Sequence, residues 1–438
     1  MYRVLILISA VSIFVPFTPP LVVHAQRVLT LEDAIGAALE SNYEIRIARN
    51  DAQIAANDYS LGNAGFLPSL SLSAQQSRRT YGRDSGESES PVFGTVNTVD
   101  MGMNVSATLF DGFGQFATYE WLESERDLAE IRADRTTEAT LAGVVISYYD
   151  LVRQQQQIEV LEEAVEISQE RVEIAQVRND LGSASELEVR LARVDLNVDR
   201  ATLLRQRVAL TNAKAEFNRL LATDAGLDYR VADTIHVVRN LSVDNLRATT
   251  LQSNKTLAVF MQSEESAHLA RREIRSEWFP TLDLTAGYAF NDFTQELGII
   301  ASRPPGLSYG LTATVDLFDG FNRRRRRENA DLHVRSAELA LADTRIAVET
   351  QLDNLYGNFR FSLELIDLER ENMGLAQMNL EVALERFRLG TITSVELRDV
   401  QSTLTNAESR FITAQFEAAR AQTELLQLSG GLIEQISN

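Results

Sequence analysis

The pentapeptide LFDGF occurs twice in this 438-residue chain, at residues 109–113 and again at residues 317–321. The segment FLPSLSL at residues 66–72 has a related partner, WFPTLDL, at residues 278–284. The two copies are 212 residues apart at the proline-containing segment and 208 residues apart at LFDGF. Anchors that nearly keep one register indicate an internal duplication.

A third anchor extends this register. Its residues return 208 positions later in the same order: Ala175, Arg178, Leu181, Gly182 and Glu188 as Ala383, Arg386, Leu389, Gly390 and Glu396. The spacing falls by four between the first two anchors, which indicates a longer loop in the first copy. We therefore expect a first structural repeat at residues 26–240 and a second at residues 241–438.

Both repeats predict the same order of elements. The first should contain a helix after Thr30, a β-hairpin at 68–110, a long helix at 113–181, a helix at 185–222 and an equatorial linker at 223–240. The second should contain a helix after Ser242, a β-hairpin at 280–318, a long helix at 321–389 and a helix at 393–428. Each first helix should run to just before Pro68 or Pro280, which mark the strand starts.

The two long helical segments contain no proline. Each would extend about 100 Å at 1.5 Å per residue. The two shorter helices of a repeat together have about the same length, which predicts a wall where each long helix is flanked by a stacked pair. The last helix carries an apolar heptad seam, formed by Leu397, Val400, Leu404, Ala407, Phe411, Ala414, Ala418, Ala421, Leu425 and Leu428. The equivalent positions of the first repeat are apolar except at Asp199 and Gln206.

The first 25 residues are typical of a secretory signal peptide. Arg3 precedes an apolar run at residues 4–17, and Val23-His24-Ala25 offers a small-x-small cleavage site before Gln26. The apolar run is too short to span a membrane, although a retained N-terminal anchor is the alternative. The chain contains no cysteine, so neither a lipidated thiol nor a disulfide can form.

The rest of the sequence has no apolar run of membrane-helix length, so a membrane-integral form would need a β-barrel. Four segments in the two hairpins alternate apolar with polar or small residues. The apolar positions are Leu70, Leu72 and Ala74; Met103, Val105, Ala107 and Leu109; Leu282, Leu284, Ala286, Tyr288 and Phe290; and Leu307, Tyr309, Leu311, Ala313, Val315 and Leu317. A half-buried sheet of a soluble protein would alternate in the same way. The signal peptide, the hairpin order and the hydroxylic polar faces favour a barrel.

Four strands are too few for this barrel, because a membrane-spanning barrel needs at least about eight. An open sheet edge is not tolerated in lipid, so the barrel must be shared between subunits. Three subunits would contribute 12 strands and a tube of helices. The predicted fold is therefore a mixed α/β membrane protein: a trimeric 12-stranded β-barrel continued by a long periplasmic α-helical coiled-coil barrel.

At this point the sequence resembles the TolC-type outer-membrane efflux proteins over essentially the whole mature chain. The resemblance rests on the duplicated element order, the prolines at the strand starts, the LFDG strand ends, the Leu-Gly helix tips and SYYDL at residues 147–151. It implies a homotrimer in the outer membrane of a Gram-negative-type cell, with most of the chain in the periplasm. The implied function is a passive exit duct of a tripartite efflux pump or a type I secretion system.

The resemblance also implies partners. These are outer-membrane lipid, a periplasmic adaptor (membrane fusion) protein and an inner-membrane pump of the RND, ABC or MFS type. Substrates would be drugs, other small toxic molecules, metal ions or secreted polypeptides. The sequence departs from better-known members at four phenylalanine or isoleucine positions. Phe113 and Phe321 replace a frequent glycine, and Phe387 and Ile392 replace a tyrosine and an arginine that latch the closed tunnel in some relatives.

A gate is expected where the long helices end. Gly182 and Gly390 suit the left-handed position that follows a helix. In the family, acidic side chains ring the periplasmic entrance near this point, and the matching residues here are Glu188, Glu396 and Asp399. Both glutamates have a second explanation, because Ser185-x-x-Glu188 and Thr393-x-x-Glu396 are capping boxes. Asp399 has no such explanation, and three copies would form a ring of like charges.

Five consecutive arginines, Arg323, Arg324, Arg325, Arg326 and Arg327, follow the second predicted hairpin. Cations at a helix N-terminus oppose the macrodipole. One hypothesis is that this run contacts phospholipid phosphates at the periplasmic boundary of the membrane; a solvated helix face is the alternative.

Composition and motifs argue against other classes. The formal net charge of −20 disfavours nucleic-acid binding. There is no phosphate-binding glycine loop, no cysteine nucleophile, and no metal-ligand spacing among His236, His268 and His333. We therefore expect no catalytic residues, no metal and no cofactor. A secreted coiled-coil scaffold or adhesin without a pore is the alternative function. A periplasmic adaptor is a third possibility, but it would need a lipoyl-like or β-barrel domain, and the sequence shows no sign of one.

Overall fold

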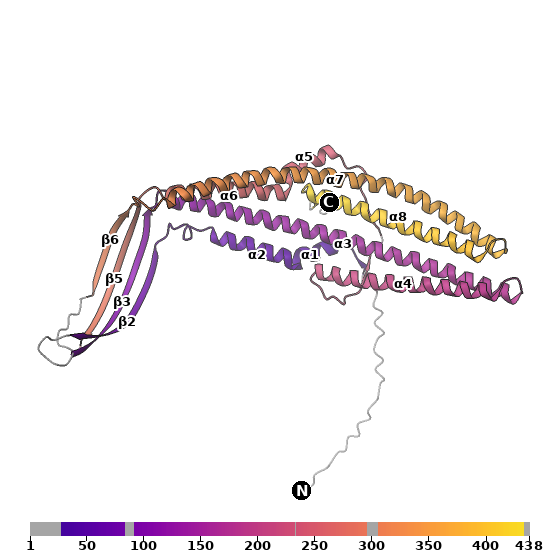
Figure 1. Cartoon of the computed structure of the whole chain (residues 1–438), viewed down its shortest axis with the longest axis horizontal. Coiled ribbons are helices and arrows are strands. Elements are labelled where there is room, and N and C mark those ends of the chain that lie inside the picture. The colour runs from indigo at the N-terminus through magenta and orange to yellow at the C-terminus, as the bar shows by residue number, and fades with distance from the viewer. Residues whose placement is uncertain (1–27, 84–91, 233, 296–304, 433–438) are drawn as a thin grey trace, which may run out of the picture.

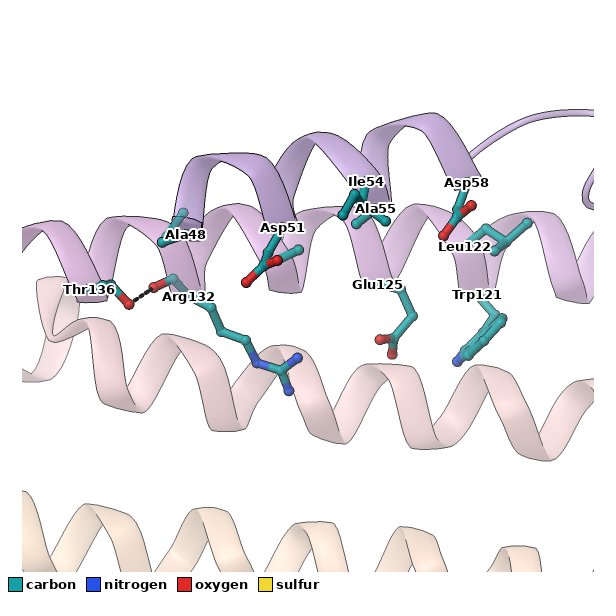
Figure 2. A pocket seen from close by; sticks show the side chains of 12 residues that line it. Ala48, Asp51, Ile54, Ala55, Asp58, Trp121, Leu122, Glu125, Arg132 and Thr136 are labelled. Atoms are coloured by element: carbon teal, nitrogen blue, oxygen red, sulfur yellow. Dashed lines mark hydrogen bonds between the residues drawn. The ribbon is translucent and has the colours of Figure 1, made fainter. Parts of the chain in front are cut away.

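The computed structural model describes residues 28–83, 92–232, 234–295 and 305–432. The predicted signal peptide lies outside the described residues. Figure 1 shows an elongated molecule, with a sheet at one end and helices along the rest of its length. Within the described ranges, no helix is long and apolar enough to cross a membrane.

The strands form one antiparallel sheet. Its members are β2 (Ser69–Arg83), β3 (Val92–Phe110), β5 (Thr281–Gln295) and β6 (Gly306–Thr314). The order across the sheet is β2-β3-β5-β6, so the hairpin of each repeat pairs with that of the other through β3 and β5. Strands β2 and β6 are the two edges.

The register keeps the predicted alternation across all four strands. One row of partners is apolar: Leu72, Met103, Tyr288 and Leu307. The neighbouring row is polar or small: Ser71, Asn104, Gly287 and Ser308. In the single chain the apolar side chains stand open to solvent, with Leu72 and Leu307 more than two-thirds exposed. The face that carries this row is thus apolar and uncovered in the part of the sheet nearest the helices, and farther out it carries Gln76 and Arg78.

The second hairpin is shorter than expected. Strand β6 ends at Thr314, whereas the sequence suggested that pairing would continue to Phe318. Thr314 pairs with Thr281, the first residue of β5. The residue before Thr281 is Pro280, which has no N–H to donate to a ladder. Val315 and Leu317 therefore lie beyond the strand, although they continue its alternation.

The helices follow the order expected for a duplication. The long helices are α3 (Gly114–Asp180) and α7 (Asn322–Arg388), and the return helices are α4 (Glu186–Leu220) and α8 (Ser394–Leu428). These bounds lie within one or two residues of the expected ones. A short parallel pair, β1 (Val28–Leu29) with β4 (Arg230–Val231), lies in the equatorial region.

The first helix of each repeat is in fact two helices. They are α1 (Leu31–Ser41) and α2 (Tyr43–Asp58) in the first repeat, and α5 (Val243–Ser253) and α6 (Lys255–Ser276) in the second. Helix α2 also stops well before Pro68, in a glycine-containing segment where Gly65 has a φ of +85°. The predicted single helix is therefore wrong in both repeats, and its end is wrong in the first.

An asparagine causes each break. The side-chain oxygens of Asn42 and Asn254 accept hydrogen bonds from backbone N–H groups of the helix that follows, which makes each an N-cap. Their amide groups also donate, each over 2.7 Å, to the carbonyl oxygens of Leu220 and Leu428. Each asparagine therefore starts one helix and satisfies a carbonyl at the end of a return helix.

The helices are arranged as the helix lengths predicted. Helix α3 contacts α2 and α4 on one side and α6 and α8 on the other. Helix α7 contacts α6 and α8. In Figure 1, α7 forms one long edge of the helical layer, and α2 with α4 forms the other. Each long helix is thus laid beside helices stacked end to end.

Apolar packing holds these helices together. Eight of the ten predicted heptad residues of α8 are buried, and the other two, Val400 and Phe411, are half-buried. A separate core joins the two repeats at the equator. There the hydroxyl group of buried Tyr148 donates to the carbonyl of Leu29 over 3.0 Å and accepts from the N–H of Ala232 over 3.1 Å. This explains the tyrosine in SYYDL.

The asparagine junction can be tested by replacing Asn254 with alanine. We expect a loss of about 1 kcal/mol for the missing N-cap, and a further 1–3 kcal/mol, roughly, for the buried carbonyl of Leu428 left without its donor. The thermal midpoint for loss of helical circular dichroism in the purified protein measures the effect. Asn406→Ala on α8, where the side chain is exposed, is the matched control. Equal midpoints for both variants would contradict the role of Asn254.

Candidate functional site

The two hairpin tips have the same backbone geometry. Gly182 and Gly390 both have a φ of +74°, in the left-handed region that favours glycine. The N–H of the following residue, Ser183 or Thr391, donates back to the carbonyl of Arg178 or Arg386 over 2.8–2.9 Å. This is the Schellman arrangement, which satisfies carbonyls at the end of each long helix. The tip turns are therefore built into both repeats.

The two expected capping boxes differ. In the second repeat the box is complete: the N–H of Thr393 donates to Glu396 over 2.7 Å, and the N–H of Glu396 donates to the hydroxyl of Thr393 over 3.2 Å. These hydrogen bonds lower the pKa of Glu396. In the first repeat Ser185 caps α4, but the carboxylate of Glu188 lies 3.6 Å from Arg178 instead of closing the box. The expected first box is thus only half formed, because an arginine attracts its carboxylate.

The three acidic gate candidates lie at the tips but on different surfaces. Glu188 lines a groove between the first turns of α4 and α8. Glu396 lines a second groove, between α7 and α8. Asp399 is exposed on α8, directly before half-buried Val400. Among the described residues of the single chain, no lysine or arginine forms an ion pair with Asp399.

The groove between α4 and α8 is apolar at its rim. Leu187, Leu191 and Val395 line it and are about half exposed or more. The same groove contains the charged groups of Glu188, Asp195 and Arg398. Solvent-exposed leucine and valine beside a few charges are typical of a surface that binds another protein.

Below this groove a polar cluster joins α3, α4 and α8. The guanidinium of Arg398 donates two hydrogen bonds to Asp199, over 2.6 and 2.8 Å. Asp199 also accepts from Ser168 of α3, and Gln401 of α8 donates to Ser168 over 2.9 Å. Arg171 of α3 is fully buried and donates to Asp195 of α4 over 2.7 Å. Burial lowers the pKa of Arg171, whereas the bonds to Asp199 raise the pKa of Arg398.

Polar contacts between helices explain the two breaks in the heptad seam of α4. Asp199 is the partner of an arginine from the other repeat, and Gln206 donates to the side chain of Gln154 on α3. The sequence signal was therefore present as two polar residues in an apolar stripe. Their partners were not predictable, because they lie on other helices.

Two further contacts join the helix tips. Arg388 of α7 forms an ion pair with Glu170 of α3. The guanidinium of Arg178 lies 5.5 Å from the ring centroid of Phe387, which is fully buried. Phe387, which stands where some relatives have a tyrosine, therefore makes a cation–π contact with Arg178. Together with Arg398 and Asp199, these pairs hold the α3–α4 hairpin against the α7–α8 hairpin.

At the sheet end, the arginine run is divided between two environments. Arg323 is buried and donates to the carbonyls of Asp316 and Glu277, and Arg326 pairs with Glu277 over 2.6 Å. Asp319 accepts from the backbone N–H of Arg323 over 2.7 Å, which offsets the unfavourable cations at this helix start. Arg323 and Arg326 are therefore bonded within the chain, and contact of the arginine run with phospholipid phosphates stays a prediction.

The other arginines of the run, Arg324, Arg325 and Arg327, are exposed. Close to them, both LFDGF motifs place glycine and phenylalanine in the left-handed region, with φ of +71° at Phe113 and +64° at Phe321. A Cβ on Gly112 would lie 2.5 Å from the carbonyl oxygen of Ser276, so only glycine fits there. The turn leaves both phenylalanine rings more than half exposed.

The α3–α8 seam also carries a titratable group. Burial, with a smaller contribution from Glu163 on α3, raises the pKa of Glu408 on α8 to about 7. Its neighbour Ser409 accepts a hydrogen bond from Gln157 of α3 over 2.8 Å. The protonated form of Glu408 therefore fits this seam better than the carboxylate does.

Glu408 predicts a pH dependence of stability. Between pH 4.5, its ordinary pKa, and pH 7, the folded chain retains a proton that the unfolded chain has lost, so stability falls as the pH rises. Glu408→Gln should raise the free energy of unfolding at pH 8 by about 1 kcal/mol, a value reduced because the group is only partly buried, and it should raise the thermal midpoint accordingly. At pH 5 the variant and the wild type should agree. The exposed Glu381→Gln is the control, and an identical response of the two variants at pH 8 would refute the assignment.

Comparison with known proteins agrees with this architecture. The sequence profile of the outer membrane efflux protein family matches residues 34–223 and again residues 246–431. The chain is 24% identical to protein CyaE of Bordetella pertussis over 403 residues, covering 91% of this chain and 83% of that protein. It is 20% identical to outer membrane protein TolC of Escherichia coli over 411 residues, covering 90% and 81% of the two chains.

The fold is that of a solved outer-membrane channel. The crystal structure of the Campylobacter jejuni CmeC outer membrane channel superposes with a TM-score of 0.74 at 18% identity, covering 93% of this chain and 89% of that chain. The two matched segments of the family profile correspond to the two repeats. The family consists of channels and not of enzymes. The chain therefore belongs to the outer membrane efflux protein family and acts as an exit duct of the outer membrane.

Proposed function

We propose that three copies of the chain close into one continuous duct, a 12-stranded barrel followed by a helical tunnel. The observation that carries this proposal is that both long edges of the chain are apolar and uncovered. Helix α7 forms one edge, and α2 with α4 forms the other. A ring results when the α7 edge of one copy packs against the α2–α4 edge of the next.

The α7 edge carries a heptad stripe of exposed apolar residues. Toward the tip its members are seven residues apart and at least half exposed: Phe361, Leu368, Leu375, Val382 and Leu389. Toward the sheet Leu332, Leu339 and Ile346 are also exposed and seven residues apart, with a step of 15 residues between Ile346 and Phe361. Exposed apolar residues in this pattern indicate a helix packing surface and not a solvated face.

The opposite edge carries a matching stripe on its two stacked helices. On α4 the exposed residues are Leu187, Leu191, Val194 and Val198, spaced 4, 3 and 4. On α2 they include Ile47 and Ile54. Helices α2 and α4 have 16 and 35 residues, together 51 against the 67 of α7, so the two edges match in chemistry over most of their length.

The sheet supports the same ring. Its free edges, β2 and β6, lie on the α2–α4 side and the α7 side, respectively. Because four antiparallel strands alternate in direction, β6 of one copy would run antiparallel to β2 of the next. A single rotation then closes both the sheet and the helical wall. Closure would pair the two free edges, which lipid requires because it offers no water to their N–H and C=O groups. It would also leave the polar face of the sheet inside the barrel.

The ring can be tested by placing a charge in the α7 stripe. Leu375→Glu should abolish the trimer, because an unpaired carboxylate would be buried between two apolar edges. Gln377→Glu adds the same charge to an exposed position of the same helix and should leave the trimer intact. Light scattering of detergent-purified protein measures the mass. A trimeric Leu375→Glu variant would remove the stripe from the interface.

The tips would form the periplasmic entrance of the duct. Exposed Asp399 is the strongest gate candidate of the three acids, because Glu396 is held in its capping box and Glu188 faces Arg178. In a trimer, three copies of Asp399 would repel one another and attract cations. The ion pairs between the two hairpins would keep the tips together until a partner arrives.

Asp399→Ala tests the gate directly. We expect a small, cation-selective conductance for the wild type in a planar bilayer, and a larger and less cation-selective one for the variant. Asp244→Ala, at the start of α5 and far from the tips, should behave as the wild type does. An unchanged conductance in Asp399→Ala would keep the duct but exclude this residue as its gate. Well-folded protein that forms no pore would favour the scaffold or adhesin alternative.

The groove between α4 and α8 is the proposed docking site of a periplasmic adaptor. It lies at the free end of the tunnel and combines exposed Val395 of α8 with the charged groups of Glu188 and Arg398. The adaptor would connect the duct to an inner-membrane pump, which supplies the energy. At the other end of the tunnel, the periplasmic boundary of the outer membrane would be contacted by exposed aromatic rings and cations, which favour lipid headgroups. These are Phe113, Phe321, Arg324, Arg325 and Arg327.

A further inference from the structure

Three metal-binding side chains meet between α6 and α7, away from the tips and from the sheet. Glu264 and His268 are one turn apart on α6, and Glu338 approaches from α7. Their donor atoms all lie within 4.8 Å of one another. Two helices of the tunnel wall therefore present one imidazole and two carboxylates to a common point.

The geometry requires little adjustment to hold an ion. Zinc binds imidazole nitrogen and carboxylate oxygen at about 2.0–2.2 Å, so the three donors would have to move together by about 1 Å. Glu264 and His268 are half-buried and Glu338 is exposed, so their side chains have room to rotate. On the opposite face of α6, Ser266 and Gln262 bond to Glu125 and Ser124 of α3. These bonds fix the rotation of α6, so the Glu264–His268 face is turned toward α7.

The charge of the cluster is not balanced by the chain. Among the described residues, neither Glu264 nor Glu338 has an arginine or lysine within ion-pair distance. The only ion-pair contact of Glu264 there is with His268 Nε2, at 3.9 Å. Nearby carboxylates of the same wall are paired, as Asp331 is with Arg271 and Glu120 is with Arg272. Two carboxylates without a lysine or arginine partner create a negative potential beside the imidazole, and this potential attracts a divalent cation.

We propose that Glu264, His268 and Glu338 bind one divalent transition-metal ion of the zinc class per chain. The imidazole selects this class, because Mg²⁺ and Ca²⁺ prefer oxygen donors alone. Three protein donors leave a position for water. The ion bridges α6 and α7 in the half of the wall nearest the sheet. No metal was expected from the sequence, because the three histidines lack a metal-ligand spacing. That criterion does not detect this site, because the two other donors are glutamates and one of them is on another helix.

Arg271 is the group that opposes metal binding. Its guanidinium lies 3.4 Å from Nδ1 of His268, and it also lies 3.5 Å from Asp331. When Nε2 binds a metal, Nδ1 carries the ring proton and no longer accepts from an arginine. Arg271 must then rely on Asp331. Removing Arg271 should therefore strengthen metal binding, because it frees the imidazole and also removes a positive charge beside the site.

The duplication provides an internal comparison. The positions equivalent to Glu264 and His268 in the first repeat are Ala52 and Ala56 of α2. The second repeat alone therefore carries the donor set, and the expected stoichiometry is one ion per chain, or three per trimer. The site is independent of the gate residues, so its test does not depend on the proposed gate.

The test is a calorimetric titration of Zn²⁺ into the full-length, tag-free protein in detergent, after treatment with a chelator. A large excess of Mg²⁺ is kept in the buffer to occupy non-specific carboxylates. We expect one Zn²⁺ per chain in the wild type, and affinity at least about tenfold weaker in His268→Gln and in Glu338→Gln. His333→Gln, an exposed histidine on α7, should bind as the wild type does. Arg271→Gln should bind more tightly.

Several results would overturn the proposal. These are an absence of Zn²⁺ binding to the wild type in excess Mg²⁺, an unchanged affinity in His268→Gln, or a loss confined to His333→Gln. Weaker binding in Arg271→Gln would also contradict the geometry. The visible absorption spectrum of bound Co²⁺ is a second readout, which should change in His268→Gln because an imidazole ligand is lost. Circular dichroism and trimer mass confirm that each variant is folded.

Discussion

A sheet that enters lipid cannot keep an open edge, because no water is present to satisfy its N–H and C=O groups. This chain has two such edges, β2 and β6, and they dictate much of the rest. The helical layer below the sheet is open on the same two sides. The exposed apolar stripes on α7 and on α4 are the helical equivalent of the unpaired strand edges. Neither half of the molecule is complete as a single chain.

The position of polar residues separates two kinds of helix contact. Within one chain, the packing of α3 against α4 and α8 contains charged and amide groups: Arg171, Gln401 and the pair formed by Asp199 with Arg398. The stripe on the outer edge of α7 is apolar over many turns. Buried polar groups fix a unique register, because each must keep its partner. The intra-chain seam is thus the one whose alignment is specified most strictly.

Much of this fold was predictable from the sequence, because its signals repeat. The duplicated LFDGF and Leu-Gly segments located the ends of both long helices to within one or two residues, and period-two alternation gave the correct face of every strand. The strand end at Thr314 was missed because it depends on a partner residue that follows a proline. The breaks at Asn42 and Asn254 were missed because an asparagine within a helical pattern looks like an ordinary polar position. Its role depends on carbonyls about 175 residues away.

The candidate site was less predictable than the fold. The acidic residues at the tips were identified, but the ion pairs around them were not. Arg178 pairs with Glu188 within one hairpin, whereas Arg388 and Arg398 pair with acidic residues of the other hairpin. Residues 264, 268 and 338 belong to two helices separated by the whole second hairpin, so no local spacing brings them together. Contacts across the wall are tertiary information, and a duplication in the sequence does not contain them.

The asparagine junctions have a mechanical consequence for the tunnel. A strict seven-residue apolar repeat, such as that of α8, imposes a left-handed supercoil on the helices that share it. Were the flanking helices continuous from tip to sheet, that coiling would be transmitted along the entire wall. Because the flanking helices are interrupted at Asn42 and Asn254 while α3 and α7 run through, the twist of the half near the tips need not match that of the half near the sheet. The half near the tips and the half near the sheet can therefore adopt different pitch along one wall.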